Sequence, residues 1–211
     1  MTSVVDFEAV IRHFGPQAVS ILHSPKWADT DNKVIQAVNN QSAPDRIEVM
    51  RGWLQSYGVF RGITHLQQLP IASAVLQWAD SREERGKLTT ADDICQAHES
   101  LMEFCIAAYG KNRDFKSLAS KALWLCYPDD VPLFDSRTQC ALCVFSKLED
   151  GIAPRADDAS EYRQFVHVWK AFYEKYKDTI TSLEMHNYPY PVRVFDVILW
   201  IIGSPGYKAV V

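Results

Sequence analysis

Apolar residues in this chain recur mostly at every third or fourth position, and few stretches alternate apolar and polar residues with a period of two. That spacing places apolar side chains along one face of a helix, so it predicts an all-α protein. Thr90, followed by Ala-Asp-Asp, is typical of a helix N-cap, and Pro44 after Ser42 suits another helix start. We expect about ten helices, at approximately residues 4–13, 16–23, 33–38, 44–57, 65–81, 91–109, 115–127, 136–148, 158–176 and 192–202.

Two polar stretches interrupt this helical pattern. Residues 81–90 are charged and poor in apolar side chains, and residues 149–160 precede the long amphipathic helix. Because no internal repeat divides the chain, residues 1–211 are expected to form one compact helical unit. If that unit has two lobes, residues 81–90 are the expected place for a hinge.

The composition is that of an ordinary globular protein, with 47% hydrophobic and 23% charged residues in a chain of 211. Lys and Arg number 22 against 26 Asp and Glu. This balance argues against a protein that coats nucleic acid by bulk charge, but it leaves a local basic patch open.

Three features favour a cytoplasmic protein that is not inserted in a membrane. Asp6 and Glu8 interrupt the region where an export signal would need an apolar run. The longest strongly apolar run, Val197–Ile202, is far shorter than the roughly 20 residues that span a bilayer. The cysteines are odd in number and lie in apolar, helical surroundings, which favours reduced thiols at Cys95, Cys105, Cys126, Cys140 and Cys143.

A short basic cluster stands out in a chain of net charge −4. Within eleven residues a single aspartate, Asp114, opposes Lys111, Arg113, Lys116 and Lys121. Charge of this kind fits either a patch that holds phosphate or the solvated surface of a turn and a helix.

Lys121 differs from the other basic residues because of its place on a predicted helix. Leu118, Ala122 and Leu125 form one apolar stripe. Lys121 borders that stripe, whereas Lys116 points away from it. An amine that loses part of its hydration is more often neutral and nucleophilic, which suits Schiff-base chemistry. The alternative is a lysine whose stem packs while its charge reaches water.

Asp135 follows Val-Pro-Leu-Phe and precedes a predicted helix. An aspartate at this place commonly caps the helix by accepting backbone N–H groups. The same placement holds a carboxylate where it can stabilise a developing cation or activate a nucleophile. Capping and catalysis are therefore compatible interpretations.

No motif indicates a metal or a nucleotide cofactor. Cys140 and Cys143 have C-x-x-C spacing, but they lie inside an amphipathic helix and no second pair occurs at metal-ligand spacing. His98 and His167 fit helix faces better than ligand positions. We therefore expect neither a metal site nor a cofactor.

Three segments resemble the helix–hairpin–helix DNA glycosylases, a family that includes the 8-oxoguanine DNA glycosylases and endonuclease III. That family has a hairpin of the form G-V-G-x-K, a helix, and an apolar-Pro-apolar-Asp segment that opens the next helix. Here Ser-Leu-Ala-Ser before Lys121 is similar to the hairpin, and Val131–Asp135 is similar to the later segment. The stretch Arg193–Trp200 resembles divergent bacterial members of the 8-oxoguanine branch, some of them encoded in antiphage operons.

The resemblance implies an all-α, two-lobed fold and a DNA N-glycosylase, with or without AP-lyase activity. Its partner would be duplex DNA in which a damaged or modified base is flipped out of the stack. Lys121 would attack the sugar C1′ and form a Schiff base, and Asp135 would assist it. The resemblance implies DNA contacts for Lys111, Arg113, Lys116, Ser117, Ser120 and Arg137, and a base pocket containing Phe134, Asp196 and Trp200.

The chain departs from the family at the hairpin and in one spacing. Ser117 and Ala119 stand where the hairpin has glycines, which normally let the backbone approach a phosphate closely. Lys121 precedes Asp135 by 14 residues, fewer than is usual in the family, whereas Lys116 precedes it by 19. Lys116 is therefore the reserve candidate for the nucleophile.

Two alternatives follow from these observations. The altered hairpin supports a catalytically inactive module on the same scaffold, which would bind modified DNA or a protein partner, for instance in antiphage defence. For Asp196, which lies one turn from Arg193 and from Trp200, the simpler alternative to a base pocket is an ion pair beside a packed aromatic ring.

Overall fold

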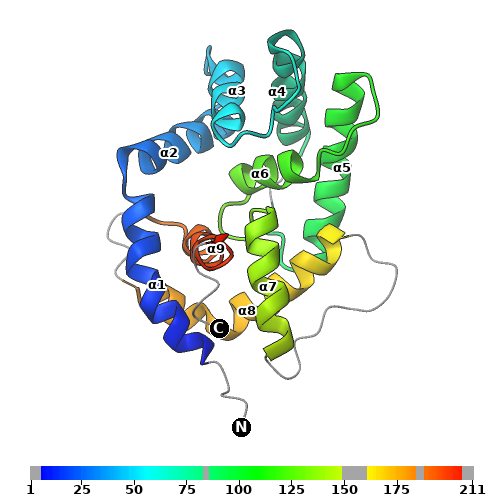
Figure 1. Cartoon of the computed structure of the whole chain (residues 1–211). Helices are drawn as coiled ribbons and strands as arrows, with labels where there is room; N and C mark the ends of the chain where they lie inside the picture. The colour runs from blue at the N-terminus through cyan, green and yellow to red at the C-terminus, as the bar shows by residue number, and fades with distance from the viewer. Residues whose placement is uncertain (1–5, 83–85, 149–160, 184–187, 206–211) are drawn as a thin grey trace. The chain divides into compact units, whose positions relative to one another are not determined.

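The computed structural model describes residues 6–82, 86–148, 161–183 and 188–205, and this part of the chain contains nine α-helices and no strand (Figure 1). The predicted all-α class is therefore confirmed. None of the described helices combines the length and the apolar character needed to cross a membrane. The helices are α1 (Phe7–Leu22), α2 (Pro25–Asn39), α3 (Arg46–Ser56), α4 (His65–Asp80), α5 (Ala91–Tyr109), α6 (Lys116–Cys126), α7 (Ser136–Leu148), α8 (Glu161–Thr181) and α9 (Pro191–Ile202).

The separate helices predicted at residues 4–13 and 16–23 are one continuous helix, so that prediction was wrong. Pro16 lies inside α1 and removes one backbone N–H donor, but the apolar face continues on both sides of it and keeps the helix in one piece. Gly15 allows a close approach here, because a Cβ at this position would lie 2.5 Å from Cδ2 of Leu183. The helix predicted at residues 33–38 is also longer, since it forms the second half of α2.

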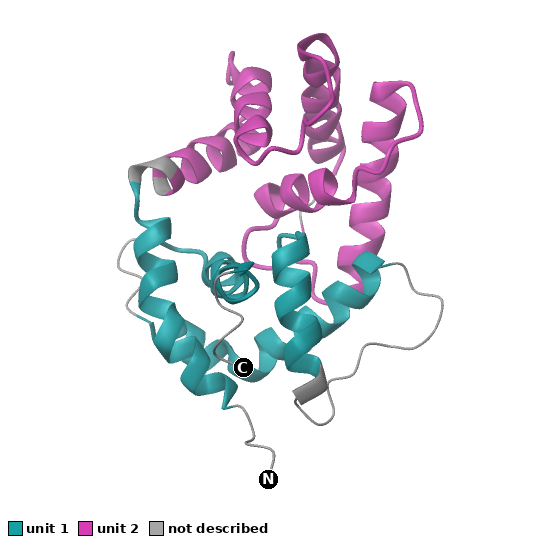
Figure 2. Cartoon of the chain, viewed as in Figure 1, with its two compact units in different colours: residues 1–24, 132–211 teal, residues 25–131 magenta. Residues whose placement is uncertain are grey.

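The chain divides into two compact units (Figure 2). Unit 1 comprises residues 1–24 and 132–211, and unit 2 comprises residues 25–131. The segment 81–90, predicted as a possible hinge, lies inside unit 2. The second polar stretch, residues 149–160, lies outside the described residues.

In unit 1, α9 packs against α1, α7 and α8. Every residue of α9 from Val192 to Leu199 is buried, so this helix lies at the centre of the unit. Phe7 on α1 contacts rings of the other three helices, with ring centroids 4.4 to 6.3 Å apart, at Phe145, Phe172, Tyr176 and Phe195. This aromatic cluster supplies much of the apolar core of unit 1.

In unit 2, α6 packs against α2, α3 and α5 and is buried from Leu118 to Cys126. Trp124 on α6 stacks on Trp53 of α3, with ring centroids 6.1 Å apart and planes 10° apart. The indole N–H of Trp53 donates to the buried carboxylate of Asp31 on α2 at 2.8 Å. These contacts place α6 in the core of its unit.

Arg46 joins three helices of unit 2. Its Nη1 and Nη2 donate to the two carboxylate oxygens of Asp80 on α4, at 2.6 and 2.9 Å. Its Nε and Nη2 also donate to the carbonyls of Ala37 and Val38 near the end of α2, at 3.2 and 3.4 Å. Because bidentate arginine pairs are geometrically specific, this guanidinium fixes the end of α2 and the start of α3 against α4.

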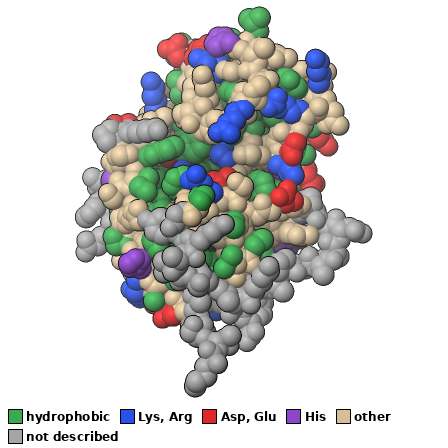
Figure 3. Space-filling model, viewed as in Figure 1, with side chains coloured by type: hydrophobic (Ala, Val, Ile, Leu, Met, Phe, Trp, Pro, Cys, Tyr) green, Lys and Arg blue, Asp and Glu red, His purple; other side chains and the backbone are tan. Residues whose placement is uncertain are grey.

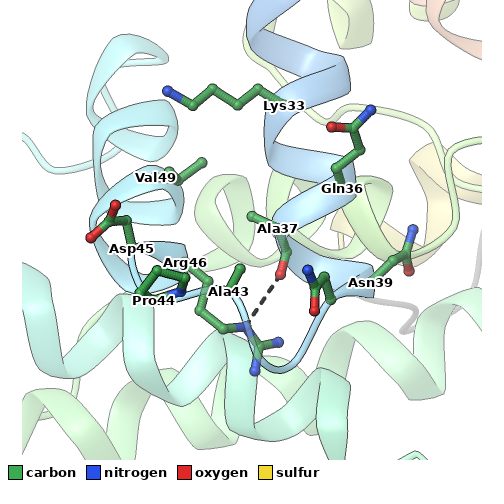
Figure 4. Close-up of a pocket in the computed structure, with 10 residues that line it drawn as sticks. Lys33, Gln36, Ala37, Asn39, Ala43, Pro44, Asp45, Arg46 and Val49 are labelled. Carbon is green, nitrogen blue, oxygen red and sulfur yellow. Dashed lines mark hydrogen bonds between the residues drawn. The ribbon is translucent and has the colours of Figure 1, made fainter.

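The same turn shapes a surface cleft of about 550 Å³ between α2 and α3 (Figure 4). In that view the Arg46 side chain reaches the Ala37 carbonyl at one end of the cleft. The site residues predicted from the sequence are not among those that line it, which are Lys33, Gln36, Ala37, Asn39, Asn40, Ala43, Pro44, Asp45, Arg46 and Val49.

We expect Arg46→Ala to lower the free energy of unfolding by about 2 to 3 kcal/mol, because it removes the guanidinium that donates to a half-buried carboxylate and to two helix carbonyls. Urea denaturation followed by circular dichroism measures this. The matched control is Arg12→Ala. Loss of the exposed ion pair between Arg12 and Glu8 should lower the free energy of unfolding by less than about 0.5 kcal/mol. Equal losses in the two variants would contradict the role given to Arg46.

Candidate functional site

Lys121 lies on the buried helix α6 and is itself only 5% exposed. Its Nζ donates to Oγ of Ser117, one turn earlier, at 2.9 Å. A buried lysine charge is costly unless polar groups compensate for its lost hydration. The sequence placed this amine at the edge of the apolar stripe, and the structure places it further inside.

The residues that resemble the glycine hairpin are helical. Ser117 to Ser120 belong to the first turns of α6, where the Ala119 N–H donates to the Phe115 carbonyl at 2.8 Å. Ala119 and Ser120 are fully buried. This stretch therefore offers helix backbone in place of a glycine-rich turn.

The basic cluster before Lys121 is largely engaged within unit 2. Arg113 donates to the Arg61 carbonyl, and its guanidinium lies over the rings of Tyr109 and Phe115. Lys116 pairs with Asp114, with Nζ and Oδ2 3.3 Å apart. Lys111 is exposed, so it is the residue of this cluster best placed to meet an anion from solution.

The wider surface shows both signs of charge. On the face drawn in Figure 3, acidic side chains are interspersed with basic ones. This agrees with the net charge of −4, and any contact with a phosphate backbone would have to be local.

His98 on α5 positions the start of α6, a role the sequence did not reveal. The side chain is 2% exposed, and its Nε2–H donates to the backbone carbonyl of Lys116 at 2.9 Å. Burial lowers the pKa of His98 from 6.5 to about 4, and the hydrogen bond to Lys116 opposes this only in part. The imidazole is therefore neutral at physiological pH and holds the turn that precedes Lys121.

Asp135 caps α7, as one of the two sequence interpretations expected. Its Oδ1 accepts the backbone N–H groups of Arg137 and Thr138 at 2.8 and 3.0 Å. The Thr138 hydroxyl donates back to the Asp135 carbonyl at 2.9 Å. These bonds hold a half-buried carboxylate at the start of a helix, where the positive end of the helix dipole favours its charge.

Asp196 is fully buried and joins three parts of unit 1. Its Oδ2 accepts the Leu133 N–H at 2.8 Å, and its Oδ1 accepts the indole N–H of Trp169 at 2.9 Å. Burial raises the pKa of Asp196 to about 8, against the lowering effects of Arg193 and of these two N–H donors. The sequence suggested Arg193 as a partner, but it missed Leu133 and Trp169 because both are distant along the chain.

Near the end of α9, Arg137 lies over the exposed ring of Trp200, with Cζ 4.5 Å from the ring centroid. Arg137 Nη1 also donates to the Ser204 hydroxyl at 3.2 Å. A Cβ at Gly203 would lie 2.0 Å from the Arg137 carbonyl oxygen, so only glycine permits this approach of α9 to α7.

The remaining predicted pocket residue, Phe134, is buried in unit 1. Its ring lies edge-on to Tyr162 and to Phe165 of α8, with centroids 5.7 and 5.0 Å apart. In this structure it packs in the core.

The predicted site residues thus form two groups, one in each unit. In unit 2 the structure brings Lys121, Lys116 and Ser117 together on α6. In unit 1 it brings Asp135 close to Asp196 and places Arg137 over Trp200. Lys121 and Asp135 therefore belong to different units.

The cysteines are free thiols. Cys95, Cys105 and Cys126 are buried, whereas Cys140 and Cys143 are exposed on α7. Within the described ranges, His, Cys, Asp and Glu side chains do not gather in any group of three or more that could hold a metal ion.

Comparisons with protein-family models, with curated proteins and with solved structures found no match to this chain. The resemblance to helix–hairpin–helix glycosylases therefore stays a prediction from the motifs that carry it.

Burial of neutral His98 predicts a loss of stability in acid. Between pH 6.5 and 4 the unfolded chain binds a proton at this histidine that the folded chain does not. The free energy of unfolding should therefore fall by about 1.5 kcal/mol between pH 6.5 and 5. Urea denaturation at both pH values measures this, and His98→Gln, which keeps a donor for the Lys116 carbonyl, should remove most of the difference. An unchanged difference in that variant would contradict the assignment.

Proposed function

We propose that this protein is a DNA N-glycosylase with β-lyase activity, which removes a damaged or modified base from duplex DNA. Lys121 is the nucleophile and Asp135 its electrostatic partner. The observation that carries the proposal is the Lys121 amine, which is 5% exposed and bonded to the neutral hydroxyl of Ser117 at 2.9 Å. A lysine held in surroundings of this kind is suited to act as an amine nucleophile.

The proposed reaction proceeds in two stages. The Lys121 amine reacts in its deprotonated form: its nitrogen forms a bond to the sugar C1′ while the bond from C1′ to the base breaks, and the base leaves with that electron pair and takes up one of the two protons of the nitrogen. The sugar ring then opens, its oxygen takes a proton, and the nitrogen loses its remaining proton as the Schiff base forms. Positive charge develops on the sugar during the first stage, and a carboxylate stabilises it.

Asp135 has the properties that this role needs. Two backbone N–H groups at the start of α7 fix its Oδ1. A carboxylate that is already oriented requires little reorganisation when the sugar becomes cationic.

A second candidate function is a binding module that recognises modified DNA without cleaving it. It is favoured by the helical stretch Ser117–Ser120, which is buried from Leu118 onward, and by the internal contacts of Arg113, because both reduce what the hairpin region offers to a phosphate backbone. Such a module would bind DNA but would not need a reactive amine at Lys121.

Borohydride trapping separates these two functions. The purified protein is mixed with duplex DNA containing an abasic site or 8-oxoguanine, and borohydride reduces any Schiff base to a stable secondary amine that denaturing gels detect. We expect an adduct with the wild type and with Lys116→Ala, and at least a hundredfold less with Lys121→Ala, because only the Lys121 amine attacks.

Asp135→Asn is the matched variant for the carboxylate. Asparagine caps helices about as well as aspartate, so α7 should stay intact while the adduct forms more slowly. An adduct that persists in folded Lys121→Ala contradicts the assignment of the nucleophile. DNA binding with no adduct on either substrate, in folded wild-type protein, favours the binding module.

A further inference from the structure

We propose that Asp196 is a positioning residue whose protonation state controls how firmly Asp135 is held, and that it thereby regulates the proposed glycosylase site. Its consequence for catalysis rests on the proposed function, but the control of Asp135 is a property of unit 1 and is testable without any activity. The geometry of the hydrogen bonds carries the inference.

Each oxygen of Asp196 has its own N–H donor. Oδ2 accepts from the Leu133 backbone at 2.8 Å and Oδ1 from the Trp169 indole at 2.9 Å. Both bonds suit an ionised carboxylate, which is an acceptor at both oxygens. A protonated carboxyl has one donor oxygen, so gaining a proton weakens one of the two bonds.

The bond to Leu133 leads directly to Asp135. Leu133 lies two residues before Asp135, whose backbone N–H donates to the Thr138 hydroxyl at 3.2 Å. Thr138 also donates its backbone N–H to Oδ1 of Asp135. The segment between α6 and α7 is therefore fixed at Leu133 by Asp196 and at Asp135 by the first turn of α7.

Burial and two nearby charges determine where Asp196 titrates. Burial raises the pKa of this group to about 8, Asp135 adds to the rise, and Arg193 opposes it. Below about pH 8 the Asp196 carboxyl of the folded chain keeps its proton. As the pH rises above this value the proton is lost, and the Leu133 and Trp169 N–H groups then donate to an ionised carboxylate.

Several charged groups on the other helices packed against α9 have partners of their own. On α1, Glu8 pairs with Arg12 at the exposed surface, and on α7, Arg137 lies over Trp200. On α8, Lys170 pairs with Glu174 at 3.8 Å, and His167 is half-buried. The charges that act on Asp196 are accordingly those of Arg193 and Asp135.

Nuclear magnetic resonance of the full chain tests this inference. Uniformly labelled protein is titrated from pH 6 to 9.5, and the Trp169 indole and the backbone amides of Leu133, Arg137 and Thr138 are followed. We expect all four signals to shift with a shared midpoint near pH 8. The last two report on Asp135, because they donate to its Oδ1.

Two variants sharpen the test. Asp196→Asn should abolish the shared transition, whereas Asp178→Asn, an exposed aspartate on α8, should leave it unchanged. The wild-type titration carries the test by itself if Asp196→Asn does not fold. Wild-type protein with no shared transition would overturn the inference. So would shifts at Trp169 and Leu133 that do not extend to Arg137 and Thr138.

Trapping rates over the same pH range separate this inference from the proposed function. If the trapping rate changes with pH at the same midpoint as the four signals, the result supports both this inference and the proposed function. If no adduct forms at any pH while the four signals titrate together, the proposed function fails and control of Asp135 by Asp196 stands. A rate that is flat across the observed transition would show that Asp196 does not regulate the site.

Discussion

The buried carboxylate of Asp196 is the constraint on which the arrangement of unit 1 depends. It is 0% exposed, and its two oxygens accept N–H groups from α8 and from the segment before α7. A buried polar group is tolerated only where hydrogen-bond partners surround it, so α8, α9 and this segment have to meet at one point. The place of Asp135, and with it the start of α7, follows from that meeting.

In unit 2, too, polar side chains fix helices through the hydrogen bonds that they make, but the residues are different. The Arg46 guanidinium joins three helices, and neutral His98 holds the first turn of α6. Lys121 is buried in the same unit: it is 5% exposed, and its amine donates to the Ser117 hydroxyl at 2.9 Å. An amine removed from water in this way is suited to nucleophilic chemistry, and this burial is the physical basis for proposing that Lys121 has a chemical role.

The sequence predicted those features, such as helix caps, that depend on residues close together in the chain. Thr90 caps α5 through the Asp93 N–H at 3.1 Å, as its Thr-Ala-Asp-Asp context indicates, and Asp135 caps α7. Periodicity identified the all-α class but predicted two separate helices where the structure has α1. The helix continues through Pro16 because its apolar face outweighs one lost hydrogen bond. The partners of Asp196 and Arg113 were not predictable, since Leu133 lies 63 residues from Asp196 and Arg61 lies 52 from Arg113.

The central claim is that the amine of Lys121 forms a covalent bond to a sugar. The most direct measurement is tandem mass spectrometry of the borohydride-reduced adduct between the wild-type protein and duplex DNA, after digestion of both polymers. The account predicts a deoxyribose remnant on Lys121, in the peptide from α6. A remnant on Lys116, or on a lysine outside α6, would contradict it.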